Sequence, residues 1–140
     1  VNVNNVRFGN ISAQSFSVIS PTEIRAQVAA AGNTGLVTVV AMAGFGNSAG
    51  TFTFVQPPTI TSFTPSQGTS GATVQVRGSN FVSPLTVRFG GVPGTNLDVV
   101  SPTELFVDVG AGATGNVSVT TPGGTATSAT VFTFFGAPVI

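Results

Sequence analysis

The chain has 140 residues, enough for one domain or two small ones, and only 6% of them are charged. Four arginines balance four acidic residues and there is no lysine, so no basic face is present to bind nucleic acid or an anionic membrane surface. The absence of cysteine excludes disulfides, zinc–thiolate sites and thiol nucleophiles, and the low charge indicates that neighbouring copies cover part of the surface.

Apolar and polar residues alternate with a period of two along the whole chain, and clusters of Gly, Pro, Asn and Ser interrupt the alternation. This pattern predicts an all-β sandwich without long helices. Before the Gln56-Pro57-Pro58 junction, the predicted strands are Val3–Phe8, Ser15–Ile19, Glu23–Val28, Leu36–Ala41 and Thr51–Val55. After the junction they are Thr59–Phe63, Thr73–Arg77, Leu85–Phe89, Leu97–Val100, Glu104–Val109, Asn116–Thr120 and Thr127–Phe134.

The two parts of the chain contain the same motifs in the same order. The tetrapeptide Val-Arg-Phe-Gly stands at 6–9 and 87–90, and Ser-Pro-Thr-Glu stands at 20–23 and 101–104, 81 positions apart. Thr-Gly, Ser-Ala and Phe-Thr-Phe follow in both copies with an offset of 80. These matches indicate an internal repeat. The predicted domains are a partial repeat at 1–56 with the last five strands, a complete repeat at 57–137, and the start of a third repeat at 138–140.

The first copy has no counterpart of residues 58–81, which hold the first two strands of the second copy. Because the chain also begins with Val1 rather than Met, we expect it to be a processed form or a piece of a longer tandem array. The missing strands come either from a neighbouring copy or from the preceding part of the same polypeptide, which we favour. Without them, apolar residues are expected to stand partly uncovered beside an unpaired strand edge. These residues are Phe8, Val18, Ile24 and Val28.

The second copy resembles the IPT/TIG family of immunoglobulin-like domains across residues 58–134. The resemblance comprises an opening Pro-x-Ile, a valine strand ending in Gly-x-Asn-Phe at 78–81, the Val-x-Phe-Gly strand, the Ser-Pro-Thr turn at 101–103 and an aromatic last strand. The first copy resembles the family from its Val-x-Phe-Gly strand onward. The resemblance implies tandem immunoglobulin-like β-sandwiches, and such repeats in prokaryotic proteins commonly form strings in large exported proteins.

Five residues of these motifs are expected to shape turns and the end of the sandwich. Gly78 and Asn80 tolerate the left-handed backbone where the second strand turns over the core, and Phe81 then closes the end of the sandwich. Gly90 suits a tight hairpin or bulge, and Pro102 restricts φ in the turn before the next strand.

Candidate catalytic groups are scarce, because the chain has no His, Cys, Lys or Tyr. The acids are Glu23, Asp98, Glu104 and Asp108. Glu104 and Asp108 lie on one face of a predicted strand but roughly 13 Å apart, which is poorly suited to a catalytic pair. The sequence therefore predicts no catalytic, cofactor-binding or metal-binding residues, and the acids are expected to be solvated surface groups.

Four residues are candidates for contacts with neighbours. Phe106 is expected to face outward, because Leu105, Val107 and Val109 fill the other face of its strand. Its counterpart in the first copy is Arg25, so it is no fixed part of the shared core. Its ring contacts a neighbour, stacks on a sugar, or is covered by the adjacent domain or a loop. Val55 and Ile60 flank the junction, and Ile24 lies on the strand that lacks its partner.

The sequence predicts a non-enzymatic structural repeat of a long extracellular or cell-surface stalk, adhesin or filament. We expect it to be secreted and to pack end to end with other copies of the same repeat or chain, with strand complementation as one route of assembly. The alternative is a carbohydrate-binding or spacer module of a larger polysaccharide-active enzyme. A glycan site usually presents Trp or Tyr, and the chain has neither. The DNA-binding branch of the family is rejected because basic residues are too few, and no apolar run is long enough for membrane insertion.

Overall fold

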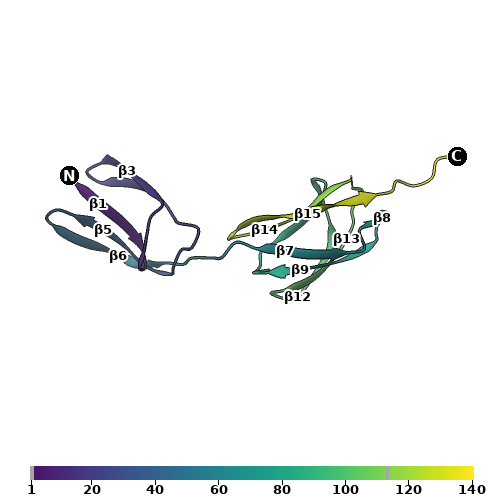
Figure 1. Cartoon of the computed structure of the whole chain (residues 1–140), viewed down its shortest axis with the longest axis horizontal. Helices are drawn as coiled ribbons and strands as arrows, with labels where there is room; N and C mark the ends of the chain where they lie inside the picture. The colour runs from purple at the N-terminus through teal and green to yellow at the C-terminus, as the bar shows by residue number, and fades with distance from the viewer. Residues whose placement is uncertain (1, 113) are drawn as a thin grey trace. The chain divides into compact units, whose positions relative to one another are not determined.

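The computed structural model describes residues 2–112 and 114–140 and contains no helix in these ranges. None of the described segments is therefore a helix that could cross a membrane. The chain divides into two compact units, one ending at Val55 and the other running from Gln56 to Ile140 (Figure 1). The all-β, immunoglobulin-like fold expected from the alternation is confirmed.

The first unit consists of a four-stranded sheet and a two-stranded sheet. The larger sheet has the order β2-β1-β5-β6, and the smaller one is the hairpin of β3 and β4. The strand bounds are β1 (Val3–Phe8), β2 (Ile11–Ser12), β3 (Ser15–Ser20), β4 (Glu23–Gln27), β5 (Gly35–Ala41) and β6 (Gly44–Phe52). Figure 1 shows the β3 hairpin on one side of this unit and β1, β5 and β6 on the other.

The second unit consists of a five-stranded sheet and a four-stranded sheet, with the orders β11-β10-β14-β15-β8 and β12-β13-β9-β7. The strands from β7 to β11 are β7 (Thr59–Thr64), β8 (Gln67–Gly68), β9 (Thr73–Ser79), β10 (Thr86–Phe89) and β11 (Val92–Pro93). The remaining strands are β12 (Thr95–Ser101), β13 (Glu104–Asp108), β14 (Gly115–Thr121) and β15 (Gly124–Phe134). Figure 1 shows the two sheets as two layers, with β14 and β15 in one layer and β7 and β9 in the other.

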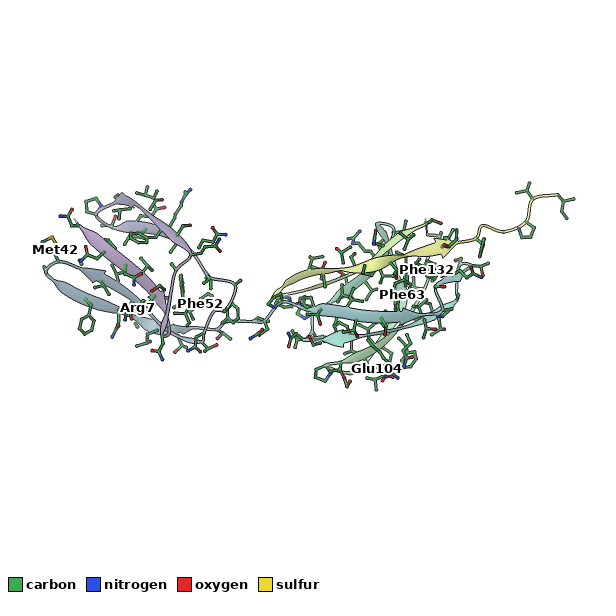
Figure 2. All side chains as sticks on the ribbon, in the orientation of Figure 1. Arg7, Met42, Phe52, Phe63, Glu104 and Phe132 are labelled. Carbon is green, nitrogen blue, oxygen red and sulfur yellow. The ribbon has the colours of Figure 1, made fainter. Side chains whose placement is uncertain are left out.

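The core of the second unit fills the space between its sheets with alternate side chains, as expected for a sandwich. Phe132 is fully buried, with its ring 5.0 Å from Phe89 and 6.4 Å from Phe63, centroid to centroid. Figure 2 shows Phe63 and Phe132 between the layers. Around them are the buried aliphatic residues Val74, Val76, Val87, Leu105, Val107, Val109, Val117 and Val119.

The core of the first unit is much smaller. Its buried hydrophobic side chains are Val6 and Phe8, and the ring of Phe8 lies 4.9 Å from that of Phe52. The expectation that Phe8 stands partly uncovered is wrong, because Phe52 of β6, on the far side of β5 in the same sheet, packs against it and Phe8 is buried. The expectation holds for Val18, which is 41% exposed.

The two units pair equivalent residues around the repeated motifs. In the first unit Phe8 pairs with Val37, and in the second Phe89 pairs with Val117. The pair Val18–Ile24 likewise corresponds to Val99–Leu105, and in each hairpin the register shifts directly after this pair, toward the Ser-Pro-Thr-Glu turn. The repeated motifs of the sequence therefore occupy equivalent positions in the two folds.

Several strand bounds differ from those predicted. The last strand of the first unit was expected at Thr51–Val55, but β6 begins at Gly44 and ends at Phe52. The glycines at 44, 46 and 50 lower β-propensity and hide this strand in the sequence, whereas pairing with β5 stabilises it. Likewise, β15 begins at Gly124 rather than Thr127, because its first residue is a glycine of low β-propensity that pairs with β14. The two-residue strands β2, β8 and β11 are too short for alternation to reveal.

Candidate functional site: the open edge of the first unit

Two of the acidic side chains are held by structural partners. Glu23 lies 3.6 Å from Arg25 as an exposed ion pair. Glu104 accepts a hydrogen bond from the Gln75 amide at 3.0 Å and lies 4.0 Å from Arg77 on the neighbouring strand. Within residues 2–112 and 114–140 no three acidic residues cluster as metal ligands would.

The pKa of Asp108 is shifted by its hydrogen-bond partners. Its carboxylate accepts hydrogen bonds from the Thr73 hydroxyl at 2.6 Å and from the Asn96 amide at 3.0 Å. Both bonds favour the charged form and lower the pKa of Asp108 below its ordinary value of 3.8. Asn96 lies in β12 and adopts φ of 48°. Its bond to Asp108 joins β12 to β13, so the Asp108 carboxylate has a structural role and is not a free acid or base.

The segment at the end of β9 was expected to use a left-handed backbone at Gly78 and Asn80. Asn80 has φ of 59°, and its side-chain amide donates to the carbonyl oxygen of Pro57 at 2.9 Å. The expectation is wrong for Gly78, which is part of β9. Glycine is needed there because a Cβ would collide with the carbonyl oxygen of Thr59 and the ring of Phe81.

Phe81 lies in the core of the second unit and is only 2% exposed. Its backbone N–H donates to the carbonyl oxygen of Pro102 at 3.0 Å, which joins the end of β9 to the turn before β13. Pro102 is exposed within that turn, and the Ser101 hydroxyl accepts the N–H of Thr103 at 3.2 Å. Gly78 N–H also donates to the Thr103 carbonyl, so this turn is a docking point for β9.

Gly90 opens the turn between β10 and β11 with φ of 55°, and Gly91 follows with φ of 85°. A Cβ on Gly115 would meet the Cα of Gly90 at 2.5 Å, so the two backbones touch. Gly9 and Gly35 repeat this contact in the first unit, where the corresponding distance is 2.6 Å. The glycines of the repeated motifs therefore allow close approach as well as a left-handed turn.

The predicted interface residues lie in different surroundings. Phe106 is half-buried on the outer side of β13, opposite Gln75 of β9. Ile60 packs against the hydrophobic core of the second unit, the unit to which it belongs. Val55 is half-buried and lies after the end of β6. Ile24 is half-buried in β4.

The surroundings of Ile24 form a partly enclosed site in the first unit that is lined mainly by apolar side chains. A cavity of about 300 Å³ lies between β4, β3, β1 and β5. We call it the β4 cavity, and its lining residues are Val3, Val18, Ser20, Pro21, Thr22, Glu23, Ile24 and Val39. Among the described residues, β4 pairs with β3 alone.

Sequence reasoning identified Ile24 and Val18 as uncovered but did not find the cavity. Val3 and Val39 complete its wall, and they come from strands on the opposite sheet. Comparison of the two copies could have pointed to Val39, because its counterpart in the second unit is the buried Val119. The exposed tip of the β5–β6 hairpin was also missed: Met42 is 78% and Phe45 74% exposed, and Figure 2 shows Met42 at this tip.

This architecture defines an immunoglobulin-like β-sandwich without a catalytic constellation among the described residues. The IPT/TIG domain family model matches residues 58–134, and the chain belongs to this family. It is accordingly a structural or binding module. No curated protein matches the chain.

Solved structures with a similar fold come from larger proteins. SGBP-B from a complex xyloglucan utilization locus in Bacteroides uniformis matches 94% of this chain and 42% of its own, with 18% identity and a TM-score of 0.52. The plexin A4 full extracellular region matches 95% of this chain and 13% of its own, with 17% identity and a TM-score of 0.56. A putative phosphatase from Bacteroides thetaiotaomicron matches 57% and 18%, with 28% identity and a TM-score of 0.52. This chain thus spans less than half the length of each of these proteins.

Proposed function

We propose that the chain is a non-enzymatic piece of a tandem immunoglobulin-like array in a long extracellular or cell-surface protein, such as a stalk, adhesin or filament. The observation that carries the proposal is the recurrence of the same strand registers in two consecutive units, down to the register shift beside each Ser-Pro-Thr-Glu turn. The similarity to an extracellular region of plexin A4 over both units is consistent with this location.

The domains proposed are residues 1–56, 57–137 and 138–140. Pro57 and Pro58 join the first two, and both contact the second unit. Pro58 is buried, and the carbonyl of Pro57 accepts the hydrogen bond from Asn80. Only a short stretch between β6 and Pro57 is then free to bend, which favours a stiff connection.

Immunogold electron microscopy on cells of the native source tests the location and the assembly. Antibodies raised against the whole chain are expected to label fibrous or stalk-like material on intact cells, and antibodies pre-absorbed with the purified chain serve as the control. Labelling that appears only after the cells are made permeable would contradict the proposal.

The second candidate is a glycan-binding module, favoured by the similarity to a protein from a xyloglucan utilization locus. Among residues 2–55, Phe45 is the aromatic residue with a largely exposed ring that could stack on a sugar. Titration of the chain with xyloglucan oligosaccharides by calorimetry and NMR tests this candidate. Binding that is lost in Phe45→Ala, but kept in the matched exposed variant Met42→Ala, would favour it over the purely structural role.

A further inference from the structure

The backbone of β4 presents an open edge on the side away from β3. The Gln27 carbonyl oxygen accepts a hydrogen bond from the Gln14 N–H of the β3 side at 2.8 Å. Backbone groups alternate between the two sides of an antiparallel strand, so those of Ile24 and Ala26 point to the other side. In the second unit the same edge, that of β13, is paired with β9 from Glu104 to Asp108.

The β4 cavity lies at the end of this open edge, and the second unit shows what fills the equivalent place. The counterparts of Val18, Ile24 and Val39 are Val99, Leu105 and Val119. Leu105 and Val119 belong to the same buried core cluster as Phe81, and Val99 packs against this cluster. Phe81 is nearly inaccessible there, and its N–H is bonded to Pro102, the counterpart of Pro21. The β4 cavity is thus lined by counterparts of residues that share a core with Phe81 in the second unit.

Three observations indicate where the occupant comes from. Val3, the first residue of β1, lines the β4 cavity, so β1 begins beside this cavity. In the second unit, residues 82–85 alone separate Phe81 from β10. In the second unit, a Cβ placed on Gly124 would lie 3.6 Å from Pro57. Gly44 is the counterpart of Gly124 in the first unit and has nearly the same φ, but a Cβ placed on it would meet no atom within 4 Å.

We propose that the open edge of β4 and the β4 cavity bind a strand pair of the Thr59–Phe81 type, supplied by the same polypeptide directly ahead of residue 1. The occupant is a valine-alternating strand that pairs antiparallel with β4 and ends in Gly-x-Asn-Phe, with its phenylalanine in the β4 cavity. Its glycine keeps the strand close to the neighbouring strand, as Gly78 does beside Thr59. This inference rests on the proposed tandem arrangement and names the segment and the site through which one repeat is completed.

The test places a copy of residues 57–81 in front of residue 1 of the whole chain and compares it with the unmodified chain. Amide hydrogen exchange at Ile24, Ala26 and Val28 is expected to slow by at least ~10-fold in the fusion, because these amides become hydrogen-bonded. In a second fusion the added copy carries Phe81→Ala, and the protection is expected to be largely lost.

A matched pair of substitutions in the first unit tests the cavity itself. Val18→Asp puts a charge into the cavity wall and is expected to abolish the protection in the fusion, whereas Ile19→Asp changes the next residue of β3, which does not line the cavity. Equal protection in all fusions would overturn the assignment of the cavity. Protection of the same amides in an unmodified chain that sediments as a dimer would assign the edge to a second copy and overturn the proposal. Unprotected amides in the fusion, with surface labelling of the native protein intact, would overturn the docking alone and leave the proposed function standing.

Discussion

The hydroxyl of Ser128 accepts a hydrogen bond from the N–H of Val117 at 2.9 Å and donates one to the carbonyl oxygen of Thr130 at 2.7 Å. Ser48 makes the same pair of bonds in the first unit, with the N–H of Val37 at 2.9 Å and the Gly50 carbonyl at 2.6 Å. Each serine lies beside the register shift between the last two strands of its unit, where the regular ladder leaves these backbone groups unpaired. The repeated Ser-Ala motif therefore satisfies the backbone at a β-bulge.

Ser128→Ala is expected to destabilise the second unit by about 1–3 kcal/mol, because it leaves a buried N–H without a partner. Ser48→Ala should cost less, since Ser48 is half-buried and water can replace its hydroxyl. Urea denaturation followed by NMR signals of each unit measures both effects. Thr127→Ala, an exposed change on the same strand as Ser128, is the control. Equal losses for Thr127→Ala and Ser128→Ala would refute the assigned role.

Gly78→Ala is expected to destabilise the second unit by on the order of 3 kcal/mol, because the added methyl group overlaps the Thr59 carbonyl. Relief would require β7 and β9 to separate, and their pairing spans most of both strands. Thermal unfolding measures the effect. Gly136→Ala is the control, since a Cβ there meets nothing within 4 Å. An unchanged midpoint in Gly78→Ala would show that the strands are not packed as described.

Asp108 is expected to make stability depend on pH in the acid range. Its pKa is lower in the folded chain than its ordinary value of 3.8, so its contribution is fully present above that value and is lost as the pH falls through the folded pKa. Asp108→Asn should therefore be less stable than the parent at pH 7, and the difference should shrink as the pH is lowered through the acid range. Denaturation at a series of pH values measures this, with Thr73→Val expected to have a similar but smaller effect. A stability difference that does not change with pH would contradict it.

The junction between the units is expected to be stiff. Replacing Pro57-Pro58 with Gly-Gly removes two restricted φ angles and broadens the range of conformations between the units. Small-angle X-ray scattering should show a wider distribution of dimensions for the variant. Asn80→Ala removes the hydrogen bond to the Pro57 carbonyl but keeps both prolines. This variant separates the effect of that hydrogen bond from the effect of the restricted proline φ angles. Identical scattering for the parent and the Gly-Gly variant would count against a stiff junction.

Much of this protein could be predicted from the order of its residues alone. Alternation located most strands, and the two copies of Ser-Pro-Thr-Glu indicated an internal repeat. Both patterns are local, so they can be read without knowledge of the packing. The family resemblance over residues 58–134 followed from motifs that stand in a fixed order. Ile24 could be identified as uncovered because its partner strand has no counterpart in the first copy.

Tertiary structure decided the features that depend on contacts between distant segments. Phe8 is covered because Phe52 lies beside it from β6, one strand beyond β5, and no local pattern near Phe8 indicates this contact. Gly78 is glycine because of the Thr59 carbonyl, whereas its sequence context suggested only a turn. The β4 cavity arises because Val3 and Val39 on one sheet face Val18 and Ile24 on the other. Side-chain alternation determines which residues point inward, but only the packing of two sheets determines what each inward side chain meets.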